Sequence, residues 1–140
     1  MPKIKVALTA RDRAPMYLRK AREFCAAART AASADRADAA LLCAVHAAIS
    51  ASDAVTVALR GQRSMDPDHQ RAADLLDDIV GTSTEGKAKV QQLRGLLAMK
   101  NLVEYEARAV SPKEAADGIK RCERLVAWAQ AELSRANLIR

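Results

Sequence analysis

Aromatic residues, glycine and proline are all scarce in this 140-residue chain. Phe, Trp and Tyr together make up 3% of the residues, and there are five glycines and four prolines. So few aromatics leave little material for stacking on nucleic-acid bases, which argues against base-stacking recognition of single strands. Half of the residues are hydrophobic, and many of these are alanine. Alanine-rich sequence with few helix breakers favours close-packed helices, so we expect an all-α fold.

Cysteine and histidine are too few and too scattered to form an obvious metal site. The three cysteines, Cys25, Cys43 and Cys122, lie far apart among apolar residues, and the chain has two histidines. An odd number of widely spaced cysteines is typical of small core residues in a reducing compartment. No pair has the CxxC spacing of a zinc site, so we expect neither a metal ion nor a bound cofactor.

Long apolar runs and a strong excess of one charge are missing as well. The first eight residues lack the apolar core of a signal peptide, and no segment approaches the roughly 18 apolar residues of a membrane span. We therefore expect a cytoplasmic protein with no membrane contact. The net charge is +6, with 23 Lys and Arg against 17 Asp and Glu. These charges are interleaved, which fits an ordinary basic domain as well as one that binds nucleic acid.

Helical spacing of apolar residues predicts a single bundle of about five helices. Residues 1–13 are expected to form an N-terminal arm with no strand elsewhere to pair with, and residues 14–136 to form the bundle. Short connections should make neighbouring helices antiparallel, which gives an up-and-down bundle. The expected helices are 15–30, 36–60 with Asp35 as N-cap and Gly61 as stop, 67–80 with Asp66 as N-cap, 87–109, and 112–136 with a capping box at Ser111 and Glu114.

The up-and-down order predicts a polar cluster at one pole of the bundle. In this order the second helix ends, the third begins and the fourth ends at the same pole. Ordinary structural explanations remain open: Arg63 as a cap of the second helix, His69 as a surface residue, His46 as a hydrogen-bonded core residue, and Lys100 as the partner of Glu104. The residues expected to meet at the pole are Asp53, Arg63, Ser64, His69, Lys100, Asn101 and Tyr105.

Two helical segments resemble a known family. They are the alanine-rich segment 39–53 and the segment 96–105, which ends in Lys100, Asn101 and Tyr105. Over about residues 14–135 the chain is similar to HEPN (higher eukaryotes and prokaryotes nucleotide-binding) domains, helical bundles common in toxin–antitoxin and defence systems. Members that cut RNA carry R-N-x-x-x-H. Here Lys100 stands at the arginine position, Asn101 matches, Tyr105 stands at the histidine position, and no histidine follows His69.

The resemblance implies RNA or nucleotide binding and a homodimer with its groove between two protomers. In a metal-free endoribonuclease, His69 would take a proton from a ribose 2′-hydroxyl while Arg63 or Lys100 stabilised the phosphorane. Tyr105 completes the catalytic set, and Asp53, Ser64 and Asn101 would support RNA binding. The alternative is a non-catalytic dimeric scaffold that binds another protein, such as a cognate antitoxin or nucleotidyltransferase. A basic DNA-binding bundle is a third reading without helix-turn-helix spacing to support it.

Overall fold

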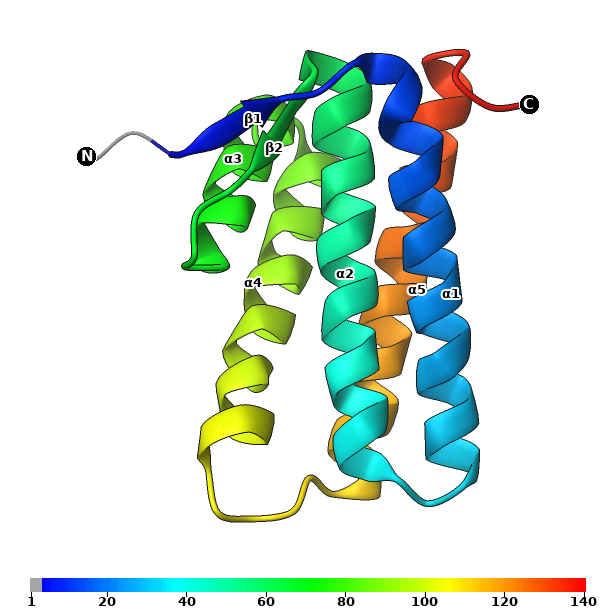
Figure 1. Cartoon of the computed structure of the whole chain (residues 1–140), viewed down its shortest axis with the longest axis vertical. Coiled ribbons are helices and arrows are strands. Elements are labelled where there is room, and N and C mark those ends of the chain that lie inside the picture. The colour runs from blue at the N-terminus through cyan, green and yellow to red at the C-terminus, as the bar shows by residue number, and fades with distance from the viewer. Residues whose placement is uncertain (1–3) are drawn as a thin grey trace.

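The computed structural model describes residues 4–140, and five α-helices in this range pack into one bundle (Figure 1). The predicted all-α bundle is therefore confirmed. The helices are α1 (Ala14–Ser33), α2 (Ala37–Arg60), α3 (Gln70–Val80), α4 (Thr84–Tyr105) and α5 (Pro112–Arg135), and the remaining elements are the 3₁₀ turn η1 (Arg11–Arg13) and the strands β1 (Val6–Leu8) and β2 (Gln62–Ser64). The four long helices run alternately down and up, and the shorter α3 lies outside α2 and α4.

The N-terminal arm is not an unpaired segment, and that expectation was wrong. β1 pairs antiparallel with β2, with Val6 opposite Ser64 and Leu8 opposite Gln62. Backbone hydrogen bonds at both ends extend the pairing: Thr9 N donates to the Gly61 carbonyl at 2.9 Å, and Met65 N donates to the Lys5 carbonyl at 2.8 Å. The arm is thus tied to the connection between α2 and α3. The first three residues of the predicted arm lie outside the described range.

Helix ends marked by strong local signals are where the sequence predicts them, and the others shift. Gly61 ends α2 in a left-handed conformation, with φ 64°. Ser111 and Glu114 form the complete capping box of α5. By contrast, α3 begins at Gln70 rather than at Pro67, and α4 spans Thr84–Tyr105 rather than 87–109, with Ser83 as its N-cap. Asp35 does not cap α2, since it takes a positive φ of 59° just ahead of the helix.

α2 is the central helix of the bundle. Every residue from Ala51 to Ala58 is buried, because α1, α3, α4, α5 and β2 surround this half of the helix. Small alanine side chains permit such close packing on all sides. Asp53 lies within this stretch, so its carboxylate is surrounded by the bundle and not by bulk water.

By length and composition, α2 is also the one helix among residues 4–140 that could cross a membrane. Its apolar window has a mean hydropathy of 1.6. The helix has 24 residues, so the expectation that no segment approaches the length of a membrane span was too strong. Within the bundle, 72% of that window is buried against the other elements.

The predicted meeting point at a pole is wrong in its position. α2 ends at one pole of the bundle and α4 ends at the opposite pole (Figure 1). The reason is β2, which carries the chain back along the side of the bundle after Gly61, so that α3 starts partway down and runs in the same sense as α2. As a result, the start of α3 lies beside the middle and lower part of α4. The predicted residues meet on the side of the bundle instead.

Candidate functional site

His69 lies between two adjoining pockets on this side of the bundle. It is the residue just before α3, at the end of the connection that begins with β2. All six other predicted site residues lie around it, three in each pocket. The first pocket, about 160 Å³, is lined by Pro67, Asp68, His69, Gln70, Leu97, Lys100, Asn101 and Tyr105. The second, about 250 Å³, is lined by Ile49, Asp53, Arg63, Ser64, Met65, Asp66, His69 and Ala72.

Arg63 is held in an ion pair with Asp53. Its Nε donates to Oδ2 of Asp53 at 3.2 Å. Burial raises the pKa of Asp53 to about 6, although the positive charge of Arg63 opposes the rise. The guanidinium carbon of Arg63 also lies 5.3 Å from the ring centroid of Tyr17, within cation–π range. Arg63 therefore neutralises a buried carboxylate, and a phosphate group would have to compete with Asp53 for it.

Arg63 does not cap α2. Arg11 does so instead, because its Nε donates to the Ala58 carbonyl at 2.6 Å. Ser64 is also used within the protein, since its Oγ accepts a hydrogen bond from the Asp66 backbone N–H at 3.4 Å. Arg63 and Ser64 thus both have structural partners in addition to their place in the second pocket.

Lys100 is paired in the way that its spacing indicates. Its Nζ lies 2.7 Å from Oε2 of Glu104, and the hydrogen bond from Lys100 lowers the pKa of Glu104. The Lys100 side chain is only 14% exposed and contributes to the wall of the first pocket. Tyr105 is largely open to solvent, with 78% of the residue exposed at the end of α4. Asn101, one turn before it, is also exposed.

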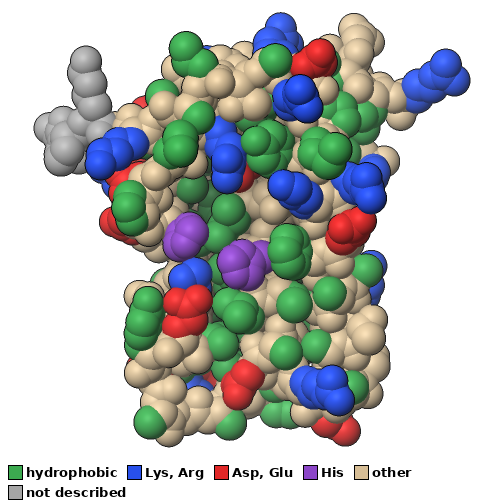
Figure 2. All heavy atoms as spheres, in the orientation of Figure 1, with side chains coloured by type: hydrophobic (Ala, Val, Ile, Leu, Met, Phe, Trp, Pro, Cys, Tyr) green, Lys and Arg blue, Asp and Glu red, His purple; other side chains and the backbone are tan. Residues whose placement is uncertain are grey.

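His46 belongs to the same surface, and sequence reasoning missed it. It is half-buried on α2, with its ring centroid 5.4 Å from that of Phe24. Burial lowers the pKa of His46, and the positive charges of Lys100 and then His69 lower it further. Figure 2 shows the two histidines side by side about halfway down this face, with hydrophobic side chains around them. The available signal was the face that His46 shares with Asp53, two helical turns later.

Phe24 lies on the surface beside His46 and does not face the core. It is 38% exposed, whereas Leu18, Ala21, Cys25 and Ala28 form the buried stripe of α1. The surface around the histidines is therefore partly apolar. A cation also flanks this surface. Lys20 Nζ lies 5.6 Å from the centroid of the Tyr17 ring, and its positive charge lowers the pKa of Asp53.

The site has the parts for acid–base chemistry and for holding an anion. Two imidazoles, one lysine, two amides and one phenol lie within or beside adjoining pockets. Among residues 4–140, no group of three or more His, Cys, Asp or Glu side chains is arranged to hold a metal ion. No protein-family model, curated protein or solved structure matches the chain, so its resemblance to HEPN domains stays a prediction.

Proposed function

We propose that this protein is a HEPN-like RNA-binding protein that cleaves RNA without a metal ion at the two pockets around His69. The observation that carries the proposal is that His69 lines one pocket together with Lys100, Asn101 and Tyr105. These three residues follow His69 by 31 to 36 positions in the sequence. A net charge of +6 supports attraction of a polyanion.

The chemistry assigned to each residue follows from its place. His69 takes the proton from a ribose 2′-hydroxyl, whose oxygen then attacks the adjacent phosphorus. Lys100, which lines the same pocket, stabilises the negative charge that grows on the phosphorane. The bond from phosphorus to the 5′-oxygen breaks, and the Tyr105 hydroxyl supplies a proton to that leaving oxygen. Arg63 is assigned to holding β2 against Asp53, which narrows the originally expected catalytic set.

His46 supports this arrangement from the neighbouring helix. Because burial, Lys100 and His69 lower its pKa, His46 is mainly neutral at pH 7. A neutral imidazole adds no positive charge beside His69 and offers a hydrogen-bond acceptor to a ribose hydroxyl. The exposed Phe24 ring next to it provides an apolar platform for a sugar or base.

A second candidate function is a non-catalytic scaffold that binds itself or a partner protein, such as an antitoxin or nucleotidyltransferase. It is favoured by the ion pairs of Arg63 and Lys100. In each pair a carboxylate of the protein already neutralises a cation that would otherwise be well placed to bind RNA. Partly exposed apolar side chains on α2 and α4 also pack against the core, and such side chains are typical of a surface that contacts protein. They are Cys43, Ile49, Met99, Leu102 and Val103.

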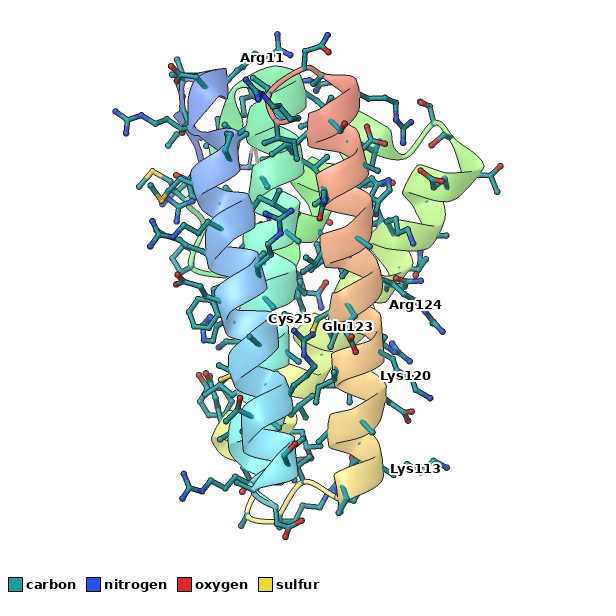
Figure 3. The ribbon with its side chains drawn as sticks, turned by 90° about the vertical axis from the view of Figure 1, so that its right-hand side faces the viewer. Arg11, Cys25, Lys113, Lys120, Glu123 and Arg124 are labelled. Atoms are coloured by element: carbon teal, nitrogen blue, oxygen red, sulfur yellow. The ribbon has the colours of Figure 1, made fainter. Side chains whose placement is uncertain are left out.

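The experiment is RNA cleavage and binding measured on the same protein samples. A fluorescent RNA oligonucleotide is incubated with the protein in EDTA, and products are resolved by electrophoresis. Anisotropy gives the dissociation constant at low and high salt. We expect cleavage by the wild type, loss of at least about 100-fold in His69→Gln and Lys100→Met, and weaker binding in Lys100→Met alone. Lys120→Met, which removes the same charge from an exposed position on α5 (Figure 3), should behave as the wild type.

The outcomes separate the two candidates. Binding that persists without any cleavage in all variants removes the catalytic role and leaves an RNA-binding protein. Neither binding nor cleavage, together with a dimer in solution whose association is weakened by Ile49→Asp, favours the scaffold. Equal RNA affinity in Lys100→Met and Lys120→Met contradicts the site itself, because the charge at the pocket would then have no special effect.

A further inference from the structure

Two cysteines from the first and last helices meet in the core on the other side of the bundle. Sγ of Cys25 on α1 lies 3.6 Å from Sγ of Cys122 on α5, and the two residues are 97 positions apart in the chain. Both residues are buried, and neither is part of a disulfide. Figure 3 shows Cys25 between the two helices, beside Glu123 of α5. Small apolar packing accounts for their burial, but it does not account for the charged group that touches one of them.

The two sulfurs have different surroundings. The Arg29 guanidinium donates a hydrogen bond from Nη1 to Sγ of Cys25 at 3.2 Å, and it is oriented by Glu123, whose Oε2 lies 3.4 Å away. A fixed positive charge therefore lies beside the sulfur of Cys25. Cys122 sits deeper, and burial, followed by the neighbouring Cys25, raises the pKa of its thiol well above the ordinary value. Cys122 thus remains a protonated thiol.

A surface pocket reaches Cys25 but is not lined by Cys122. The pocket has a volume of about 350 Å³, and Cys25, Arg29 and Glu123 contribute to its wall. A small neutral molecule the size of hydrogen peroxide fits easily into this space. Reactive cysteines are those beside a cation with a path to solvent, and Cys25 meets both conditions.

We propose that Cys25 and Cys122 form a redox-active pair that hydrogen peroxide converts into a disulfide and that a thiol reductant reopens. In the first step the thiolate sulfur of Cys25 attacks one peroxide oxygen. An S–O bond forms, the O–O bond breaks, and the hydroxide that leaves takes up the proton lost by the Cys25 thiol to become water. In the second step the Cys122 sulfur attacks the Cys25 sulfenic acid. The S–S bond forms, the S–O bond breaks, and the departing oxygen leaves as a second water with the Cys122 proton.

The geometry requires little movement for this reaction. A disulfide has an S–S distance of about 2.05 Å, so the two sulfurs must approach by roughly 1.5 Å, within the range of small side-chain rotations. Two electrons from the sulfurs reduce the peroxide, and a dithiol returns them when it reopens the bond. Once formed, the bond joins α1 to α5 and closes residues 25–122, about 70% of the chain, into a loop. It restricts the unfolded chain and stabilises the folded one.

Peroxide treatment of the purified full-length protein tests the pair, with Cys43 as an internal control. Cys43 is a free, half-buried thiol on α2, a helix that carries neither member of the pair. After oxidation we expect the wild type and Cys43→Ser each to lose two titratable thiols and to become two hydrogens lighter. The melting temperature should rise by on the order of 10 °C, and dithiothreitol should reverse the change. Cys25→Ser should show none of these effects.

Cys122→Ser distinguishes the order of the two steps. It should stop at a Cys25 sulfenic acid that dimedone labels, since the second sulfur is missing. Peptide mapping of the oxidised wild type gives an answer that does not depend on any variant folding. A Cys25–Cys122 cross-linked peptide supports the proposal. Three free thiols after peroxide, a bond to Cys43, or a bond between two molecules would overturn it.

Discussion

Arg63 on β2 and Asp53 on α2 form an ion pair 3.2 Å long that joins the small sheet to the buried core. The two ends of this contact differ in their surroundings, because the Arg63 side chain is 41% exposed and the Asp53 side chain only 10%. The ion pair therefore connects a buried carboxylate in the core to a partly exposed guanidinium at the surface. It fixes the segment that leads to His69.

The first prediction concerns the pH dependence that Asp53 imparts. The pKa of Asp53 is about 6 in the folded protein, above its ordinary value of 3.8. Between these values the folded state binds a proton more tightly than the unfolded state, so the free energy of unfolding falls as pH rises through the window. The decrease due to this group is about 3 kcal/mol. Urea unfolding from pH 4 to pH 7 should show it in the wild type and lose it in Asp53→Asn.

Asp78→Asn is the matched control for that measurement, because Asp78 is exposed on α3. Its stability profile should follow that of the wild type. A parallel decrease in Asp53→Asn and in the wild type would mean that Asp53 titrates normally in the folded protein.

The second prediction concerns the electrostatic contact between Lys100 and the histidines. Lys100→Met removes a positive charge that lowers the pKa of His46, and it frees Glu104, whose charge raises that pKa. Both effects have the same sign, so the pKa of His46 should rise. Proton NMR titration of the two imidazoles measures this directly. Lys120→Met should leave the His46 titration unchanged, and a similar shift in that variant would contradict a local effect.

The third prediction compares two glycines inside helices. A Cβ at Gly95 on α4 would meet only the guanidinium end of the Arg121 side chain, which can move aside. A Cβ at Gly118 on α5 would lie 2.6 Å from Cδ1 of Leu41, a fully buried side chain. We expect Gly95→Ala to stabilise the protein by about 0.5–1 kcal/mol, since alanine favours helix. Gly118→Ala should destabilise it by about 1–2 kcal/mol.

Chemical denaturation of the two glycine variants under identical conditions gives the comparison its own control. The same residue change is made in both helices, so the helix propensity gained is shared. Equal effects in the two variants would mean that α5 and α2 have room to separate at Leu41.

The fourth prediction concerns the start of α5. Ser111 Oγ accepts a hydrogen bond from the Glu114 backbone N–H at 3.1 Å. Ser111→Ala removes this bond and should lower the free energy of unfolding by about 1 kcal/mol. Ser134→Ala, at an exposed position near the end of the same helix, should change stability little. Thermal unfolding followed by circular dichroism is sufficient to tell the two variants apart.

The fifth prediction concerns acid denaturation. Hydrogen bonds from Arg108 and from the Ser111 backbone lower the pKa of Glu114 to about 2, against an ordinary value of 4.5. Glu114 therefore contributes stability above pH 4.5 that is lost as pH falls toward 2. Glu114→Gln should flatten the stability profile in this range. Glu85→Gln, in the exposed first turn of α4, should keep the slope, and a loss in both variants would point to a general charge effect.

Features set by a few neighbouring residues were predictable from sequence. Gly61 ends α2 because a left-handed residue is needed there, and Ser111 with Glu114 closes a capping box within four positions. The helical bundle itself follows from the spacing of apolar residues over each helix. These signals are local, so the rest of the fold does not alter them.

The pairing of β1 with β2 could not be predicted in this way. Each strand has three residues, too few for an alternating pattern, and more than 50 positions separate them. The start of α3 was misplaced for a related reason. Pro67 suits a first helical turn, but Asp66 and Asp68 each accept a backbone hydrogen bond from two residues later. Those bonds shape turns that delay the helix to Gln70.

The grouping of the candidate site residues was predictable, but its location and its membership were not. Asp53, Arg63 and His69 came together because the chain between them is short. The pole assignment failed because it assumed that each connection reverses direction at once, whereas β2 first runs back beside α2. His46 was missed because its apolar neighbours suggested a core position, and the open surface beside Phe24 depends on how α1 packs against α2.

The docking of β1 on β2 has a practical consequence for handling the protein. A fusion partner attached ahead of β1 would disturb β2, the strand that carries Arg63. Through the turns after β2 it would also disturb the position of His69. The opposite end of the chain follows α5 and emerges on the far side of the bundle from β1 (Figure 1). Affinity tags, fluorophores and surface tethers are therefore best attached after Arg140, where they do not disturb the two pockets around His69.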